Sequence, residues 1–524
     1  MQGSERDSGL RLAELVAVFS LAMDLGLGQP MEHVLRSWLI AARLGDHLGV
    51  ARDQRGSLYY VVTLAWVGCV ADTPEVANWF GDDIAYRGDS YRIDMAGLPL
   101  LGFMLGHVGA GKPALDRLRL AANLAVSGGH AIERGMMSHC LTTGRMAERL
   151  GLGADVCDPL QQVFTRWDGK GVPSGVGGEA IALPMRLFHL ADVVEVFHRA
   201  GGTEAAVDVA RDRRGSHFDP AVVDAFCAVA AEVLGDPATE ADWQALIADE
   251  PSLQRHLSQG ELDTALEAIA DFTDLRSPSR VGHSRGVANL VARAAVHSGL
   301  PDSDVVTVRR AALLHDIGLH GVPASILDKP GRLSESESER MRMHAYYTER
   351  MLTRPPALAR LGSIAALTHE RCDGSGYHRG LAGAAIPATG RLLAAACAFH
   401  AMTEPRSHRP AMTAKQATAE LRSEVRLGRF DANSVEAVLV GAGQSHGKRR
   451  TGPAGLTPRE VEVLTLIARS ASNRQVAQKL GITAKTAGTH IERIYSKIGA
   501  SSRSTATLFA LQQGLLDTLE RFDL

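Results

Sequence analysis

One pair of adjacent residues in this sequence is well placed for chemistry: His315 followed directly by Asp316. The pair closes an apolar run with helical spacing, and Gly318 follows two residues later. Adjacent side chains on a helix point about 100° apart, so the pair can converge on one ion but cannot share a simple core face. A pair of this kind on its own is equally an ordinary helix-end cap, so its neighbours must decide between the two interpretations.

Further residues of the same chemical types surround the pair. They are His283, His344 and His369-Glu370, the last leading into Asp373-Gly374-Ser375-Gly376-Tyr377. Imidazoles and a carboxylate suit Zn, Mn or Fe, and an aspartate with two oxygens can bridge two ions. Paired ions can activate water and neutralise a phosphodiester during in-line displacement. The sequence therefore predicts a centre for one or two divalent metal ions.

The elements that would position these residues are predicted to be helices. Of the 524 residues, 45% are apolar and 22% charged, while aromatic residues make up only 5%. Ala, Leu and Val dominate, and apolar residues recur at helical spacing, as in Leu12, Leu15, Val16 and Phe19. Few segments alternate as a strand would. We expect an all-α fold.

Changes of pattern divide the chain into four parts. Glu250-Pro251 marks a boundary, and residues 441–455 form a Gly-rich, basic linker without periodicity. We expect a first helical domain at 1–250, a second at 255–440 and a compact unit at 456–520. From Lys448 onward the chain carries twelve Lys or Arg against six Asp or Glu, a charge of +6 that leaves −9 on the rest. A basic C-terminal part on an acidic body indicates a polyanionic partner.

The remaining composition argues against secretion and membrane insertion. The six cysteines are scattered without a CxxC pair, which favours reduced thiols. The polar N-terminus is no signal peptide, and the longest apolar run, Leu58 to Val70, is too short to cross a bilayer. We expect a cytoplasmic protein with no membrane partner.

Residues from about 275 to 440 resemble an HD-GYP domain, the cyclic-dinucleotide phosphodiesterase subgroup of the HD superfamily. The HD pair together with His369-Glu370 and Asp373-Gly374-Ser375-Gly376-Tyr377 carries the resemblance. The resemblance implies metal ligation by His283, His315, Asp316, His344 and His369, and a bound cyclic dinucleotide. For that ligand we assign contacts to Asp373, Gly376 and Tyr377.

The sequence departs from the family pattern at positions that matter for catalysis. Thr368 replaces the first histidine of the family's His-His-Glu, Leu319 replaces the lysine after the HD pair, and His378 replaces the GYP proline. Downstream, Cys397 and His400 replace two aspartates, the first of which is a metal ligand in the family. Upstream, Ser279 stands at the position of a glutamate ligand. Losing a charge that stabilises the transition state typically costs ~10²–10³ in rate. Cys397 is either a thiolate ligand, since zinc accepts sulfur, or an inert buried cysteine. We expect one retained ion and weakened catalysis, with His320, His378 and His400 outside the centre.

The first half resembles a degenerate copy of the same domain. Residues 166–173 parallel 371–378, and His33 precedes Ala65 by 32 residues, as His283 precedes His315. At the same spacings the HD pair becomes Ala65-Trp66, and Phe164 stands where His369 does; His139 and Asp192 correspond to His344 and Cys397. About 45 extra residues lie between Trp66 and His139. We expect Trp66 and Phe164 to fill the metal cavity, leaving this half metal-free.

The C-terminal unit carries the signals of a helix-turn-helix. Thr457, Pro458 and Glu460 predict a capped helix start, a second helix spans 473–480 and ends at Gly481, and Thr483 caps a third at 484–497. The stretch from Leu456 to Leu516 resembles the LuxR-type DNA-binding domain, here of four helices. Candidate contacts to double-stranded DNA are Lys485, Thr486, Thr489, His490, Arg493 and Lys497.

Two details of this unit bear on assembly and affinity. Gly488 stands where the family usually has a basic residue. The resemblance implies that the last helix, 502–515, mediates dimerisation through residues such as Ala506, Phe509, Ala510 and Leu511, so we expect a homodimer that reads two half-sites.

Two functions follow from these patterns. The first is a transcription regulator whose HD-GYP-like domains sense a signal and bias the DNA-binding unit. The alternative is an active metal-dependent cyclic-dinucleotide phosphodiesterase that also binds DNA. His315-Asp316 supports the second function, whereas Leu319, Thr368 and Cys397 oppose it.

Overall fold

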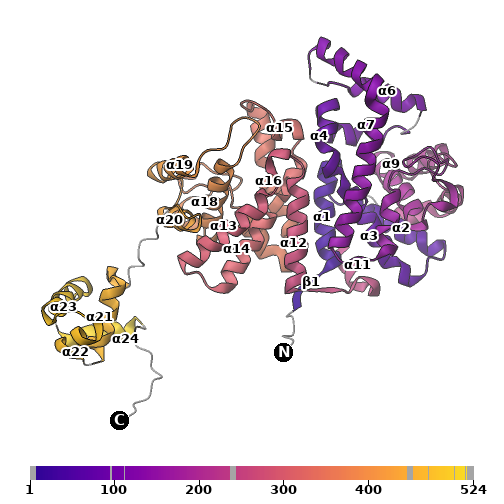
Figure 1. The fold of residues 1–524 in the computed structure, drawn as a ribbon. Helices are drawn as coiled ribbons and strands as arrows, with labels where there is room; N and C mark the ends of the chain where they lie inside the picture. Colours follow the sequence, from indigo (N-terminus) through magenta and orange to yellow (C-terminus); the bar gives the residue numbers. More distant parts are fainter. Residues whose placement is uncertain are drawn as a thin grey trace. The chain divides into compact units, whose positions relative to one another are not determined.

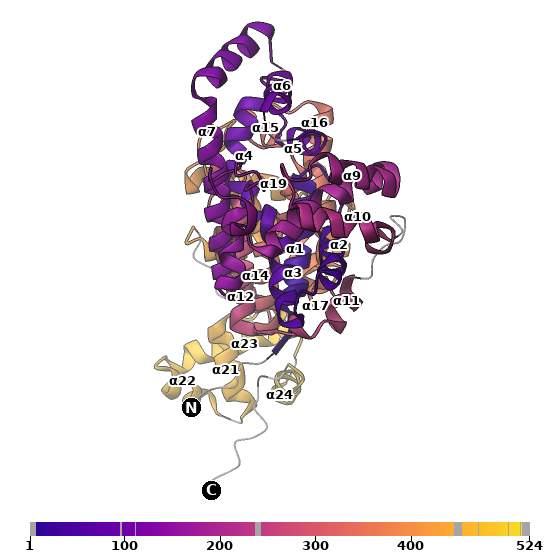
Figure 2. The ribbon, with the colours of Figure 1, turned by 90° about the vertical axis from the view of Figure 1, so that its right-hand side faces the viewer.

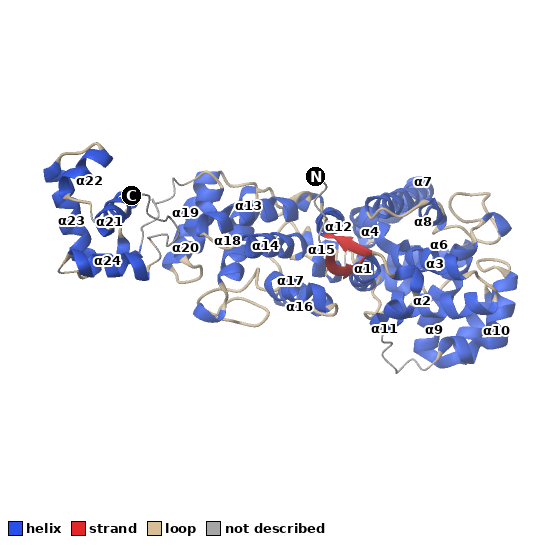
Figure 3. Cartoon of the chain, turned by 90° about the horizontal axis from the view of Figure 1, so that it is seen from below, coloured by secondary structure: helices blue, strands red, loops and turns tan. Residues whose placement is uncertain are grey.

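The computed structural model describes residues 7–94, 97–110, 112–235, 243–444, 453–469, 471–500, 502–513 and 515. It has two compact units, Met1–Gln444 and Ser445–Leu524. As predicted, the fold is all-α, and the described residues contain a single two-stranded sheet (Figure 3). Most of the predicted linker, residues 445–452, lies outside the described residues. None of the described helices is both long and apolar enough to cross a membrane.

The first half of unit 1 begins with a short strand and continues as helices. Its elements are β1 (Asp7–Arg11), α1 (Leu12–Gly26), α2 (His33–His47), α3 (Arg55–Leu64), η2 (Ala65–Gly68), α4 (Cys69–Phe80), α5 (Asp83–Ser90), α6 (Gly97–His107), α7 (Ala114–Arg149), α8 (Ala154–Cys157), α9 (Leu183–Asp212), α10 (Pro220–Leu234) and α11 (Trp243–Asp249). The segment predicted to hold the extra residues comprises α4, α5, α6 and the start of α7. In two perpendicular views, α6 and the beginning of α7 project from the rest of the unit (Figures 1 and 2).

The second half repeats the order of strand, long helix and histidine-led helix. Its elements are β2 (His256–Ser258), α12 (Gln259–Asp274), η6 (Pro278–Arg280), α13 (His283–Ser298), α14 (Asp302–Leu314), η7 (Ile317–Gly321), α15 (Ala324–Leu327), α16 (Glu335–Leu352), α17 (Pro356–Ala365), α18 (Ala388–Thr403), α19 (Ala414–Arg426) and α20 (Ala432–Gly441). The predicted boundary at Glu250-Pro251 lies between α11 and β2.

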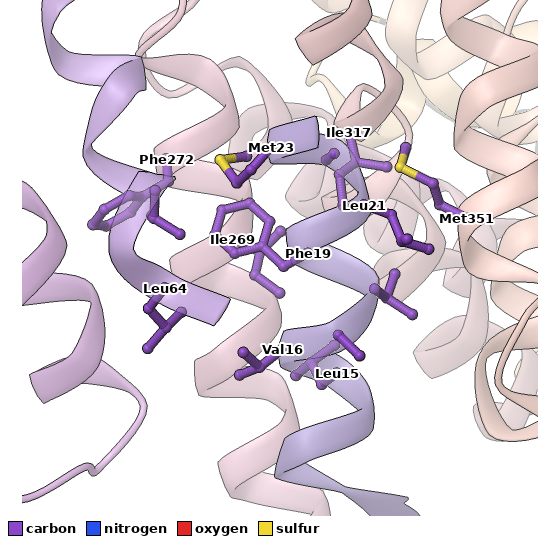
Figure 4. Packing of buried hydrophobic residues seen from close by; sticks show 14 of the residues in the cluster. Leu15, Val16, Phe19, Leu21, Met23, Leu64, Ile269, Phe272, Ile317 and Met351 are labelled. Atoms are coloured by element: carbon purple, nitrogen blue, oxygen red, sulfur yellow. The ribbon is translucent and has the colours of Figure 1, made fainter. Parts of the chain in front are cut away.

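The two halves share one apolar core. β1 pairs with β2 in antiparallel fashion, which joins the start of one half to the start of the other. Helix α1 follows β1 and is buried on all sides, as a central helix with apolar residues all round should be. Around it gather side chains from both halves, among them Leu64, Ile269, Phe272, Ile317 and Met351 (Figure 4). The metal-ligand region after α14 is thereby packed directly against α1.

A buried ion pair also joins the halves. The Asp83 carboxylate on α5 is fully buried and accepts hydrogen bonds from Arg87 and from Arg276, both at 3.1 Å. Its other oxygen accepts from the backbone N–H of Ala324 at 2.8 Å, and Arg276 also donates to the Val322 carbonyl at 2.9 Å. Asp83 of the first half therefore fixes the segment that follows Asp316 in the second.

Unit 2 contains α21 (Pro458–Ala468), α22 (Asn473–Leu480), α23 (Ala484–Ile498) and α24 (Arg503–Gln512). Thr457 and Glu460 form the predicted capping box, and Gly481 ends α22 in the left-handed conformation. These local signals explain why the predicted bounds of α22 and α23 agree with the structure to within a residue, whereas the last helix, predicted at 502–515, ends at Gln512.

Candidate metal centre and DNA-binding surface

His315 lies at the C-terminal end of α14, where the buried run Ala311 to Leu314 stops. Its Nδ1–H donates to the carbonyl of Ala312 at 2.7 Å, so Nε2 is the nitrogen left to face inward. That nitrogen lies 3.3 Å from Oδ2 of Asp316, and both residues are 1% exposed. The adjacent pair thus converges, as predicted, and is not merely a cap.

A first group of donors forms beside this pair. The Sγ atom of Cys397 on α18 lies 3.7 Å from Nε2 of His315 and 3.8 Å from Nε2 of His283. His283, at the first position of α13, also approaches Oδ2 of Asp316 at 3.9 Å. Of the two interpretations of Cys397, the structure favours the one in which its sulfur faces the centre.

A second group of donors lies near the other carboxylate oxygen of Asp316. Nε2 of His344 is 4.0 Å from Oδ1, and His369 brings a third donor within reach of one ion. The His344 Nδ1–H donates to the carbonyl of Met341 at 2.5 Å. Its Nε2 is buried and has no hydrogen-bond partner among the described residues. An orphaned imidazole nitrogen that points at a carboxylate is the arrangement a metal ion would satisfy.

The imidazoles of the centre are held neutral. Burial lowers the pKa of His283 to about 3 and that of His344 to about 4, and it lowers the pKa values of His315 and His369 well below the ordinary range. A neutral imidazole is the form that binds metal.

The donors fit a divalent ion. Zinc holds thiolate sulfur at about 2.3 Å and imidazole nitrogen at about 2.0–2.1 Å, so sulfur and nitrogen on one tetrahedral ion lie about 3.6 Å apart. The separations of 3.7 and 3.8 Å around Cys397 agree with that value. In the described part of the chain, three groups of donors lie close enough together to hold an ion: His283-His315-Cys397, His283-His400-Glu404 and Asp316-His344-His369. The first and the last share no residue, although Asp316 lies between them.

Three residues beside the centre were not expected from the sequence. Glu404 accepts the Nδ1–H of His283 at 2.7 Å, which directs the opposite nitrogen of that ring inward. Arg406 donates to Glu404 at 2.8 Å, and Arg280 donates to Oδ2 of Asp316. His400, expected to lie outside, is 3.2 Å from Glu404 and borders the centre. No spacing rule connects these positions along the chain, and the only signal was that each charged residue lies close to a predicted ligand.

The departures from the family pattern have distinct locations. Leu319 packs into a small apolar cluster with Val322 and Ile326, so no cation stands there. The Thr368 hydroxyl donates to the carbonyl of Ala365 instead of facing the centre. His320 and His378 lie elsewhere, against Phe19 and Glu349 respectively.

Of the three residues predicted to contact a ligand, only Tyr377 touches the centre. Its ring stacks on His369 with centroids 4.8 Å apart. Asp373 instead accepts two hydrogen bonds from Ser375 and shapes the loop. A Cβ on Gly376 would meet the backbone N of Arg371 at 2.4 Å, so glycine there is a packing requirement.

The first half keeps the framework of the centre without its donors. A Cβ on Gly68 would meet the His139 carbonyl oxygen at 2.3 Å, as one on Gly318 would meet that of His344 at 2.0 Å. Close contact of the same two elements in both halves supports the predicted repeat. The Trp66 indole fills the centre as expected, with its ring against His139 and Phe164 and its N–H donating to Asp192 at 2.9 Å.

His33 of this half forms a buried charge pair with two carboxylates. Nδ1 of His33 lies 2.5 Å from Glu195, and Nε2 lies 3.1 Å from Asp192. Burial alone would lower the pKa of His33, but Glu195 and Asp192 outweigh it and raise the pKa to about 10. Burial likewise opposes ionisation of Glu195, yet His33 lowers its pKa to about 2.

We predict that this pair makes unit 1 less stable at alkaline pH. Stability from charged His33 is fully present below its unfolded pKa near 6.5 and is lost as pH rises toward 10. The urea midpoint should therefore fall between pH 7 and pH 9.5. In His33→Gln/Glu195→Gln, which removes both charges together, the fall should be smaller. An equal fall in both proteins would contradict the assignment.

Helix α23 presents one polar face. Ala487, Ile491 and Ile494 are buried against the unit's core, whereas Lys485, Thr486, Thr489 and Arg493 are exposed and His490 is partly exposed. Lys497 differs, because its amine is 2.7 Å from the carboxylate of Glu460 on α21. Five of the six predicted DNA contacts thus share an available face, and Lys497 holds two helices together.

Two of the four residues predicted to mediate dimerisation through the last helix are buried within the unit itself. Ala506 and Ala510 are fully buried in the unit's own core, and Phe509 packs against it. These three residues therefore stabilise the fold of the unit. The side chain of Leu511 lies outside the described residues.

A stability prediction follows from Gly488. A Cβ there would meet nothing within 4 Å, so Gly488→Ala should raise the free energy of unfolding of unit 2 by about 1 kcal/mol. Gly481→Ala is the matched control, because φ at Gly481 is +63° and alanine should destabilise the unit there. The thermal unfolding transition of unit 2 in the full chain measures both changes, and equal effects would contradict the argument.

Comparison with known proteins places both units. An HD-domain family model matches residues 267–434, and the luxR family of bacterial regulatory proteins matches 454–510. The 3'3'-cGAMP-specific phosphodiesterase 3 of Vibrio cholerae serotype O1 is 29% identical over 416 residues, which cover 78% of this chain and 90% of the relative. A cyclic di-GMP phosphodiesterase of Thermotoga maritima is 38% identical over 160 residues, 30% of this chain and 44% of the relative.

Among solved structures, a cyclic GMP-AMP-specific phosphodiesterase from V. cholerae is similar over 83% of this chain and 98% of its own. The TM-score is 0.58 and the identity 25%. At this coverage the likeness includes both halves of unit 1, since the second half alone is far shorter.

Proposed function

We propose that this chain, which joins an HD domain to a LuxR-type regulatory domain, is a DNA-binding regulator whose HD half senses a cyclic dinucleotide. One observation carries the proposal: five of the six predicted DNA contacts share the polar face of α23, while the metal centre keeps its histidines but has lost residues that the family uses in catalysis. The phosphodiesterase names of the relatives support a cyclic dinucleotide as the ligand class.

The centre supports binding better than turnover. The position of the family lysine belongs to the apolar cluster around Leu319, and a thiol stands at Cys397 where an aspartate is usual. Both carboxylates beside the centre, Asp316 and Glu404, are already paired with arginines. Metal would be held by Asp316, His344 and His369 on one side of the centre, or by His283, His315 and Cys397 on the other. When bound, a divalent ion there supplies positive charge for a phosphodiester group.

On the DNA side, Lys485 and Arg493 can contact phosphates while Thr486, Thr489 and His490 reach base edges. Charge supports this assignment, because the C-terminal part of the chain is basic and the remainder acidic.

The test is a gel-retardation assay with the full chain, low salt and DNA from upstream of its own gene. A retarded band is expected, and zinc with cyclic di-GMP or 3'3'-cGAMP should change the apparent affinity. His315→Ala/Asp316→Ala should bind DNA equally well but lose that response. No retardation of any such fragment would refute the regulator.

A second function, hydrolysis of a cyclic dinucleotide, is favoured by the convergence of His315, Asp316 and His344 and by the buried, orphaned nitrogen of His344. Linear product formed with Mn or Fe, and absent in His315→Ala/Asp316→Ala, would establish it. A centre that binds nucleotide without forming product leaves the sensing function.

A further inference from the structure

Asp316 is the carboxylate through which two metal ions would have to be bridged, and one of its oxygens is occupied. Arg280, at the end of η6, donates from its guanidinium to Oδ2 of Asp316. That oxygen faces His283 and His315, at 3.9 and 3.3 Å. The opposite oxygen, Oδ1, faces His344. A guanidinium therefore stands on the side of Asp316 that serves the His283-His315-Cys397 group.

Among the described residues, the other carboxylate that contacts this donor group, Glu404, is also paired. Glu404 is bound by Arg406 at 2.8 Å and by His283 at 2.7 Å. If two divalent ions were bound, they and the guanidinium would surround a single buried aspartate. Like charges at such separations repel one another strongly in a site that is shielded from water.

We propose that Arg280 is a built-in cation that takes the place of one metal ion, so that the centre binds one divalent ion on the Asp316-His344-His369 side. This inference rests on the metal centre of the proposed function and specifies its occupancy. Arg280 is a positioning residue here: it neutralises Oδ2 and leaves Oδ1 to the ion beside the orphaned nitrogen of His344.

Zinc stoichiometry of the full chain tests the proposal. The protein is stripped with a chelator, reloaded with zinc, freed of excess metal by gel filtration and analysed for bound ions. We expect one ion per wild-type chain, one in Arg280→Lys and two in Arg280→Gln, which removes the charge but keeps most of the length. Zero or two ions in wild type, or one in Arg280→Gln, would overturn the proposal.

Two further variants locate the ions. His344→Ala should remove the wild-type ion, whereas Cys397→Ala should leave it. In the Arg280→Gln background, Cys397→Ala should return the count from two to one. Loading with Co(II) adds a spectroscopic signature, because sulfur-to-cobalt charge-transfer absorption is expected in Arg280→Gln and not in wild type. If the wild type shows this charge-transfer absorption and Cys397→Ala abolishes it, the single ion lies on the Cys397 side of Asp316 and the proposal is overturned.

The folding of the variants and the proposed regulatory function are tested by separate measurements. Circular dichroism and DNA retardation by Arg280→Gln check that the variant folds. Failure of wild type to retard DNA refutes the regulator and leaves the ion counts unaffected, so the two failures are distinguishable.

Discussion

Replacing Asp83 with alanine is expected to lower the free energy of unfolding of unit 1 by about 3–5 kcal/mol. The substitution leaves the guanidinium of Arg276, which is 1% exposed, without its carboxylate partner, and it orphans the backbone N–H of Ala324. A buried charge that loses its partner keeps its desolvation cost, so the loss exceeds what the pair itself contributes. Urea denaturation followed by far-ultraviolet circular dichroism measures the change.

Two comparisons isolate the buried charge. Asp116→Ala removes an exposed carboxylate that pairs with Arg119 on the same helix, and it should change stability by no more than about 0.5 kcal/mol. Asp83→Leu/Arg276→Met removes both partners of the buried pair, and it should destabilise unit 1 less than Asp83→Ala. If Asp83→Ala and Asp116→Ala lowered the free energy of unfolding by the same amount, the ion pair between the halves would not contribute to stability.

Replacing Lys485 and Arg493 together with alanine is expected to weaken DNA binding by about 10²-fold or more. Loss of one Arg or Lys contact to DNA typically costs about 1–3 kcal/mol, and both residues lie on the exposed face of α23. Because these side chains would neutralise phosphates, the salt dependence of binding should flatten as well. Fluorescence anisotropy at several salt concentrations measures both effects.

Lys497→Ala is the matched control on the same helix. It removes an equal charge, but its amine is bound to Glu460 on α21. We expect a several-fold smaller loss of affinity than for Arg493→Ala, together with lower stability of unit 2. Equal losses of affinity for the two single variants would mean that the whole length of α23 faces DNA.

The parts of the structure that could be predicted from the sequence are those that local chemistry determines. Caps such as Thr457 and Gly481 act within one turn, so the start of α21 and the bounds of α22 and α23 were predicted to within a residue. The donors His283, His315, Asp316, His344 and His369 were likewise found by residue type and by resemblance, and the structure brings them together.

The parts that could not be predicted depend on contacts between distant segments. Arg280 reaches Asp316 across 36 residues, and Arg276 reaches Asp83 across 193. Nothing in the spacing of charged residues distinguishes such pairs from solvated ones. The ion pair of Lys497 with Glu460 escaped prediction for the same reason, because helical periodicity puts Lys497 on the polar face of its helix and says nothing of a partner on another helix.

The strand pair at the start of the two halves has a consequence for how the chain is made. β1 leaves the ribosome before its partner β2, which follows some 250 residues later. Helix α1 packs on α2 and α3 of its own half, but another face of it packs on η7 and α16, which follow later still. At about 5–20 residues per second, this apolar face stays uncovered for on the order of ten seconds or more during translation. A chain that stopped at residue 250 would keep it uncovered for good, so the first half should need chaperones until the second half emerges.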